Sequence, residues 1–444
     1  MSEGGLGAPV RHPIAWRDPD FYDSEKLDAE LRRVFDICHG CRRCFNLCDS
    51  FPRLFDLLDD SPSGELDTVD SADFKSVVDA CTLCDMCFMV KCPYVPPHEF
   101  NLDFPHLMLR YRAWEAKNGQ VSFKARQLTK TDRNCKIGCG MSSLANWACD
   151  ASNSLTRPVM QAGLGIHRDA ALPEFSAKPL TDGGRAKPEI NTNAPAFGRK
   201  AVIYATCFGN YNNTAIGEAT IKVLAQNGVE TEIVYPRCCG MPQLEQGDIA
   251  AVAESAEATA RDLGEWIQRG YDVIVLVSSC ALMLKFEWPL IVPNNDAVKR
   301  LSHATSDISE YLVGMAKKEG LADGMAALDG GVTVHMACHA RAQNMGQKAS
   351  ELLRLIPDTE ISVIERCSGH GGSWGVFKKN FEVALKIGKP VARDVKKQTP
   401  VHLVSECPLA RDHILQGVEK LDGDVSGTSD ARHPIELIAH AYGL

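Results

Sequence analysis

An internal repeat constrains the fold of this 444-residue chain more than any other feature. Two stretches, starting near residues 199 and 326, each alternate short β-rich runs with longer helical patterns. The expected strands are 201–206, 230–236 and 272–279 in the first stretch, and 332–337, 360–366 and 400–406 in the second. The expected helices lie near 214–227, 248–269, 342–355 and 376–395. This alternation is typical of α/β domains with mainly parallel sheets, so we expect one α/β unit to occur twice.

The cysteines follow the same repeat. The spacing is 131 residues from Cys207 to Cys338, 129 from Cys238 to Cys367, and 127 from Cys280 to Cys407. Each of these six cysteines comes one to three residues after an expected strand. Because ligands bind outside the carboxyl ends of strands in open α/β sheets, we expect the thiols of each unit to converge. The alternative is that these cysteines are buried and only pack, which their matching order in both units disfavours.

Two cysteine runs precede the repeat. CHGCRRCFNLC contains Cys38, Cys41, Cys44 and Cys48, and CTLCDMCFMVKCP contains Cys81, Cys84, Cys87 and Cys92. Runs of this spacing hold 4Fe–4S clusters in bacterial ferredoxins, where the fourth cysteine binds the other cluster. We therefore predict one cluster on Cys38, Cys41, Cys44 and Cys92, and a second on Cys48, Cys81, Cys84 and Cys87. A pair of zinc sites is the alternative, but zinc does not explain two triplets that are each followed by a fourth cysteine.

Composition limits the cellular location and the classes of partner that we expect for this chain. The opening segment MSEGGLGAPVRHP has no apolar leader and no stretch approaches 18 apolar residues, so we expect no secretory signal and no transmembrane helix. The 18 cysteines should then stay reduced in a cytoplasmic protein. A net charge of −9 argues against a dedicated nucleic-acid binder.

Six further motifs carry a family resemblance. The first unit contains TCFGNYNNTAIG, RCCGMPQLEQG and SSCALMLKFEWP, and the second contains HMACHARAQNMG, ERCSGHGGSWGVFKKN and ECPLARDH. With the two ferredoxin runs, the chain resembles the family of the C subunit of anaerobic glycerol-3-phosphate dehydrogenase, within the broader group that has the cysteine-rich CCG domains of heterodisulfide reductase. The resemblance covers most of residues 30–444.

The resemblance implies an α+β protein of several domains. A helical ferredoxin domain with two 4Fe–4S clusters occupies 1–125, and a connector occupies 126–198, including a Pro- and Gly-rich loop that ends near Gly198. A first CCG-type α/β domain then occupies 199–325, and a second, degenerate one occupies 326–444.

The resemblance also implies metal ligands in both CCG domains. The first should hold a third iron–sulfur cluster on Cys207, Cys238, Cys239 and Cys280, and a further family ligand falls on Met283. The second has Ser368 and Ala410 at positions where the family has cysteines. Its remaining candidate ligands, for iron or zinc, are Cys338, Cys367, Cys407, His339 and His370. Imidazole suits both metals.

The connector contains three cysteines without a motif, namely Cys135, Cys139 and Cys149. They either complete another metal site or only pack. The segment around them is moderately apolar, so it is either an interfacial helix facing membrane or quinone, or a helix packed on the ferredoxin domain.

The function implied is electron transfer between a flavoprotein dehydrogenase, or another redox subunit, and an acceptor such as quinone. No catalytic residue is assigned. The alternative is a catalytic reductase that acts on a disulfide, peroxide or thiol-linked substrate at the second CCG domain, or an electron donor to a soluble iron protein such as a peroxide scavenger. A zinc-stabilised scaffold is the third possibility. We further expect peripheral contact with the inner face of the membrane and self-association into a homo-oligomer.

Overall fold

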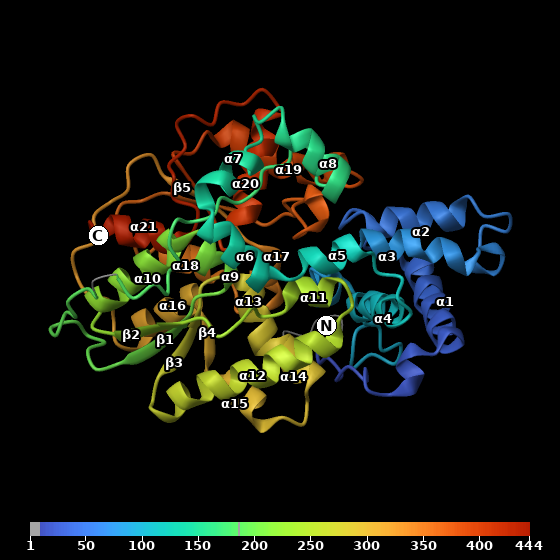
Figure 1. Cartoon of the computed structure of the whole chain (residues 1–444), viewed down its shortest axis with the longest axis horizontal. Helices are drawn as coiled ribbons and strands as arrows, with labels where there is room; N and C mark the ends of the chain where they lie inside the picture. The colour runs from blue at the N-terminus through green and yellow to red at the C-terminus, as the bar shows by residue number, and fades with distance from the viewer. Residues whose placement is uncertain (1–8, 185–186) are drawn as a thin grey trace. The chain divides into compact units, whose positions relative to one another are not determined.

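The computed structural model describes residues 9–184 and 187–444 (Figure 1). The chain forms two compact units. The first consists of Met1–Thr129, Gly240–Glu254 and Glu287–Asn294, and the second consists of Lys130–Cys239, Ser255–Phe286 and Asn295–Leu444. The first eight residues of the expected ferredoxin domain lie outside the described residues. The domain boundaries expected at 125, 198 and 325 stay predictions.

The first unit is helical, as expected for the N-terminal region. Its helices are α1 (Ser24–Cys41), α2 (Ser50–Asp59), α3 (Phe74–Ala80), α4 (Phe104–Lys117), α5 (Phe123–Leu128), α11 (Met241–Glu245) and α14 (Trp288–Ile291). Short 3₁₀ turns lie at Pro19–Tyr22, Leu66–Thr68 and Ser71–Asp73. Helix α1 begins where the Asp23 carboxylate accepts a hydrogen bond from the Lys26 amide at 2.9 Å, which is an N-cap.

Aromatic residues form part of the core of this helical unit. The Phe35 and Phe74 rings meet edge to face at 5.1 Å, and the Phe51 and Phe104 rings lie 4.7 Å apart. All four side chains are buried. Such pairs add stability beyond the area they bury, and they fix α1 to α4 around the two cysteine runs.

The second unit contains two parallel sheets, as the repeat predicts. The first sheet has the order β2 (Glu230–Val234), β1 (Lys200–Tyr204), β3 (Asp272–Val275) and β4 (Thr305–Asp307). The second has the order β6 (Ile361–Ile364), β5 (Val332–His335) and β7 (His402–Ser405). Every strand pairing is parallel. The strands end slightly earlier than expected, and the short polar edge strand β4 was not predicted.

The remaining helices surround these sheets (Figure 1). In the first repeat they are α9 (Cys207–Tyr211), α10 (Thr214–Gln226), α12 (Ile249–Gln268), α13 (Ser278–Leu282), α15 (Asp296–Ala304) and α16 (Ile308–Lys318). In the second they are α17 (Cys338–Ala342), α18 (Lys348–Leu353), α19 (Phe381–Gln398), α20 (Pro408–Glu419) and α21 (Pro434–Ala441). A 3₁₀ turn lies at Trp374–Val376 and a π-helical turn at Met283–Glu287.

Two expected helices were wrong in extent. The helix expected near 376–395 runs instead over Phe381–Gln398. The pattern at 342–355 predicted a continuous helix, but α18 starts only at Lys348. The cause is a turn in which Asn344 has φ +51 and Gly346 has φ +78, a backbone region that excludes an α-helix.

The repeat extends to helix caps that the sequence pattern did not reveal. Asp307 caps α16 in a capping box with Glu310, and His433 caps α21 in a capping box with Glu436. Both helices therefore begin with the same pair of reciprocal hydrogen bonds between side chain and backbone.

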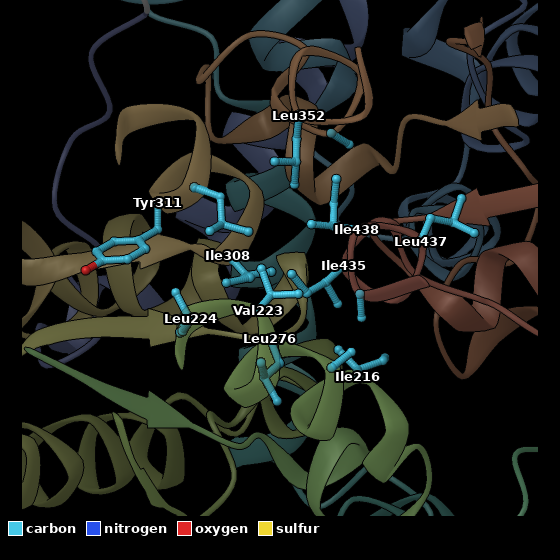
Figure 2. Packing of buried hydrophobic residues seen from close by; sticks show 14 of the residues in the cluster. Ile216, Val223, Leu224, Leu276, Ile308, Tyr311, Leu352, Ile435, Leu437 and Ile438 are labelled. Carbon is cyan, nitrogen blue, oxygen red and sulfur yellow. The ribbon is translucent and has the colours of Figure 1, made fainter. Parts of the chain in front are cut away.

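One hydrophobic core joins the two sheets. It includes Ile216 and Val223 of α10, Leu352 of α18, and Ile435 and Ile438 of α21, which Figure 2 shows from close by. Helix α10 packs against α21, and α16 packs against α18. The two repeats therefore pack together in one compact unit and are not separately folded domains.

The connector is mostly helical before its loop. It forms α6 (Thr131–Gly140), α7 (Ser142–Cys149) and α8 (Thr156–Leu164), after which the described residues up to 199 form no further helix or strand apart from one bridge at Ile166. The expectation of a loop ending near Gly198 is met. Within the second unit, α6 packs on α9. Packing of the connector on the ferredoxin domain stays a prediction.

Candidate metal centres

The first candidate centre lies at the carboxyl edge of the four-stranded sheet. Cys207 begins α9 after β1, Cys238 and Cys239 follow β2, and Cys280 lies in α13 after β3. Since β1 lies between β2 and β3, the topology brings these thiols to one edge of the sheet.

The thiols of this centre meet directly. The sulfurs of Cys239 and Cys280 lie 3.2 Å apart, and those of Cys207 and Cys238 lie 3.9 Å apart. Contact with Cys238, followed by burial, raises the pKa of Cys207, and contacts with Cys238 and Cys280, followed by burial, raise the pKa of Cys239. A bound metal cation would reverse this preference for the protonated thiols, because a metal deprotonates the thiols that coordinate it. Four soft sulfur donors, three of them on buried residues and one on the half-buried Cys207, therefore fit an iron–sulfur cluster.

The backbone around Cys207 is held in an unusual conformation. Thr206, directly before it, has φ +58 and is fully buried. Its hydroxyl oxygen accepts a hydrogen bond from the Gly209 amide at 3.0 Å. Strained backbone of this kind persists only where its surroundings fix it, and it clusters at functional sites.

Two tyrosines and an aspartate border this centre, and the sequence did not reveal them. The Tyr204 hydroxyl donates to the Arg237 carbonyl at 2.6 Å, and the Tyr235 hydroxyl donates to the Asp132 carboxylate. Burial and then the neighbouring cysteines raise the pKa of both tyrosines. Both tyrosines therefore stay neutral.

The first ferredoxin-type group gathers at one pocket. The predicted ligands Cys38, Cys41, Cys44 and Cys92 all line it. Burial, followed by Cys92, Cys44 and Cys41, raises the pKa of Cys38 well above its usual value. Burial and then Cys92 and Cys41 raise the pKa of Cys44 to about 12, although Lys91 and Arg43 oppose the shift. These basic residues lie where they offset the negative charge of a bound cluster.

The second group gathers around Cys87. Burial, followed by Cys84, Cys81 and Cys48, raises the pKa of this thiol. Cys48 of the first run, and after it Cys44, therefore influence the Cys87 thiol of the second run. The loop of the second run turns sharply, since Leu83 has φ +49 and Asp85 has φ +63.

The extra residue in the second run has a structural explanation. Cys87–Lys91 forms a π-helical turn, in which the Cys92 amide donates to the Cys87 carbonyl at 2.8 Å. A π turn accommodates one residue more than an α turn, and such turns are frequent at functional sites. Cys92 therefore reaches the pocket of the first group despite the longer spacing.

A buried ion network supports the second group. Arg11 contacts Asp85 at 2.6 Å, and Asp103 and Glu287 at 2.9 Å each. Its guanidinium also lies 4.4 Å from the centroid of the Phe88 ring. No local sequence pattern marks this network, because its members are far apart along the chain.

The second CCG region places its candidate ligands at the carboxyl edge of the three-stranded sheet. Cys338 begins α17 after β5, Cys367 follows β6, and Cys407 directly precedes α20 after β7. Cys367 is exposed. Burial raises the pKa of Cys407 to about 11. His339 lies beside Cys338 in α17.

A pair of histidines lies in this region, and only one of them, His370, was predicted as a metal ligand. The rings of His370 and His413 lie 6.0 Å apart. The Nε2 atom of each is buried and has no hydrogen-bond partner among the described residues. Burial and then His413 lower the pKa of His370 to about 3. His370 is therefore a neutral imidazole, the form that binds metals. His413, in α20, is the last residue of the motif ECPLARDH but was not among the predicted ligands.

Within the described ranges, no three Cys, His, Asp or Glu side chains are arranged to hold a single metal ion. In the same ranges, no helix is both long and apolar enough to cross a bilayer.

Comparisons with known proteins agree with the repeat. The family model described as "CCG: Cysteine-rich domain" matches residues 201–285 and again 332–409. The C subunit of anaerobic glycerol-3-phosphate dehydrogenase from Escherichia coli K12 is 25% identical over 319 residues, which cover 71% of this chain and 76% of that protein.

Two archaeal proteins are also similar. The B subunit of fumarate reductase (CoM/CoB) from Methanothermobacter marburgensis is 28% identical over 253 residues, covering 55% of this chain and 47% of that protein. The D subunit of dihydromethanophenazine:CoB–CoM heterodisulfide reductase from Methanosarcina acetivorans is 26% identical over 255 residues, covering 55% of this chain and 59% of that protein.

Proposed function

Because the chain contains two cysteine-rich domains of the CCG family and is homologous to subunits of dehydrogenases and reductases, we propose that it is an iron–sulfur electron-transfer subunit. The observation that carries the proposal is the convergence of Cys207, Cys238, Cys239 and Cys280 at one edge of the sheet. A donor set made only of thiols favours iron–sulfur chemistry over acid–base chemistry.

Two 4Fe–4S clusters on the ferredoxin-type cysteines and a third on the first CCG region would supply one-electron acceptance and release. The residues of the chain hold these clusters and set their environment. Net charge, hydrogen bonds to sulfur and exposure tune cluster potentials. Lys91 and Arg43 lie beside the first group, and the neutral tyrosines lie beside the CCG thiols. These residues tune the cluster potentials in these ways.

The electron donor in this proposal is a flavoprotein dehydrogenase or another redox subunit, and the acceptor is quinone or a similar carrier. Peripheral membrane contact on the cytoplasmic side is supported by exposed apolar side chains in the connector helices and at their N-caps, namely Ile137, Met141, Leu144, Trp147, Leu155 and Val159. Arg133 and Lys136, exposed on α6, suit contact with anionic headgroups.

The test follows electrons through the purified chain under anaerobic conditions. We expect a one-electron reductant to reduce all clusters, and a water-soluble quinone to reoxidise them. Clusters that reduce but do not reoxidise would contradict the proposed acceptor. A chain without iron and sulfide would contradict the proposed function itself.

A second candidate function rests on the second CCG region. The Nε2 atoms of His370 and His413, which have no hydrogen-bond partner in the described part of the chain, suit a metal with an open coordination position. Such a site would reduce a disulfide, peroxide or thiol-linked substrate, or pass electrons to a soluble iron protein. Reduction of a disulfide takes two electrons and two protons and yields two thiols.

One variant separates these two functions. If the second region is catalytic, Cys338→Ala abolishes substrate turnover but leaves reduction of the ferredoxin clusters intact. If the chain only relays electrons, no disulfide or peroxide is turned over by the wild-type protein in the absence of its partner.

A further inference from the structure

Helix α6 presents a face of three polar or sulfur-bearing side chains toward the first CCG region. Asp132, Cys135 and Cys139 are spaced i, i+3 and i+7, which places them on one side of a helix. Arg133, Lys136 and Ile137 are exposed on the other side. The inner face is the one that packs against α9, the helix that Cys207 begins.

Asp132 ties this face to the candidate cluster site. One oxygen of its carboxylate accepts a hydrogen bond from the backbone amide of Cys238 at 3.3 Å, and the other accepts from the Tyr235 hydroxyl. Cys135 follows one helical turn later on the same face. Its thiol interacts electrostatically with those of Cys207 and Cys238.

The other end of α6 is fixed independently. The Cys139 thiol donates to the Ser176 carbonyl at 3.0 Å, and a Cβ atom added at Gly138 would clash with the Phe175 ring. The Ser176 amide in turn donates to the Tyr211 carbonyl at the end of α9. Cys139 thus has a packing role, and α6 cannot rotate Cys135 away from the site without breaking these contacts.

We propose that Cys135 is a fifth thiolate ligand of the cluster in the first CCG region, delivered by the connector. This inference rests on the proposed function, since it assumes a cluster on Cys207, Cys238, Cys239 and Cys280. On binding, the thiol releases its proton, as every cysteine ligand does. Met283, the position of the further family ligand, is fully buried in the π-helical turn after α13, where a methionine side chain typically fills the core.

Electrostatics agree with this placement. Burial, followed by Cys238 and Asp132, raises the pKa of the Cys135 thiol to about 12. Cys135 is in turn one of the neighbours that raise the pKa of Cys207. The five sulfurs thus share one environment. Four thiolates already complete a cubane, so the fifth would make one iron five-coordinate. It would also add negative charge, and added negative charge lowers a cluster's reduction potential.

The experiment compares Cys135→Ala and Cys135→Ser with Cys139→Ala, a control on the same helix face that removes a thiol outside the site. Iron and acid-labile sulfide per chain and electron paramagnetic resonance at stepped potentials are measured on anaerobically purified full-length protein. We expect both Cys135 variants to change the signal of the third cluster and to raise its reduction potential or lower its occupancy. The signals of the two ferredoxin clusters should stay unchanged, as should all signals of the control.

A measurement on the wild-type protein covers the case in which the variants fold poorly. Cys135 should resist alkylation by iodoacetamide in the iron-loaded protein and become reactive after iron is removed, as followed by peptide mass spectrometry. Equal alkylation of Cys135 in both forms would overturn the inference.

The failures of the two proposals are distinguishable. If the wild-type chain holds a third cluster and Cys135→Ala leaves its spectrum and potential unchanged, only the fifth ligand is refuted. If the wild-type chain holds no iron at this site, the relay through the first CCG region is refuted together with it.

Discussion

The sulfur atoms of Cys239 and Cys280 lie 3.2 Å apart, although 41 positions separate these residues in the sequence. The contact follows from the topology, because β2 and β3 flank β1 in a parallel sheet and both end at the same edge. The parallel sheet thereby brings together cysteines that are far apart in the sequence, as a short loop brings together neighbouring ones.

Substitution of this pair tests the first CCG centre. Cys239→Ser replaces a soft sulfur ligand by a hard oxygen, so we expect a loss of about four iron atoms per chain, the content of one cubane. Iron and sulfide analysis after anaerobic purification measures the loss. Cys149→Ser, in α7, is the control and should retain all iron. Full iron content in Cys239→Ser would place the cluster elsewhere.

The crossed assignment of the ferredoxin-type ligands has its own test. Cys92→Ala and Cys38→Ala should abolish the same paramagnetic signal, because both thiols line one pocket. Cys48→Ala should abolish the other signal, because Cys48 lies among the thiols around Cys87. Loss of the first signal in Cys48→Ala would instead show that each run binds its own cluster.

The Arg11 network should contribute strongly to the stability of the first unit. Arg11→Met leaves the buried Asp85 without its cation and removes one of the two basic partners of Glu287, the other being His106. Breaking a buried ion pair typically costs about 3 to 5 kcal/mol, so we expect a loss of this size in the free energy of unfolding, measured by denaturant titration. Arg126→Met removes an exposed arginine in α5 and should change little. Equal stability of the two variants would contradict a stabilising role for the network.

His106 should make stability depend on pH. Burial is the largest influence on its pKa and lowers it, and Arg11 acts in the same direction, but Asp103 and Glu287 outweigh both and raise the pKa overall. Since the folded pKa exceeds the unfolded value of about 6.5, the charged ring contributes stability that is fully present below about pH 6.5 and is lost as the pH rises through the folded pKa.

The matched variant for this prediction is His106→Gln, whose amide can still donate to Glu287. The stability difference between the wild type and the variant should be larger at about pH 6 than at about pH 9. A difference that grows with pH would contradict the sign of the shift.

The repeat, the parallel sheets and the helical N-terminal region were predictable, because they depend on hydrophobic period and cysteine order. The short strand β4 was not, because its three residues Thr305–Asp307 are polar and owe their conformation to pairing with β3. Long-range partners such as Asp132 for Cys238, and His413 for His370, lie on elements whose packing no local pattern encodes. The ligand groupings themselves stay predictions until a metal is measured.

Iron, zinc and acid-labile sulfide per chain, with paramagnetic resonance at stepped potentials, test the central claim most directly. We predict about twelve iron atoms or more, the sum of three cubanes, and three separable redox transitions. About eight iron atoms would leave the CCG regions without clusters. Zinc in place of iron would contradict electron transfer by this chain and indicate a scaffold.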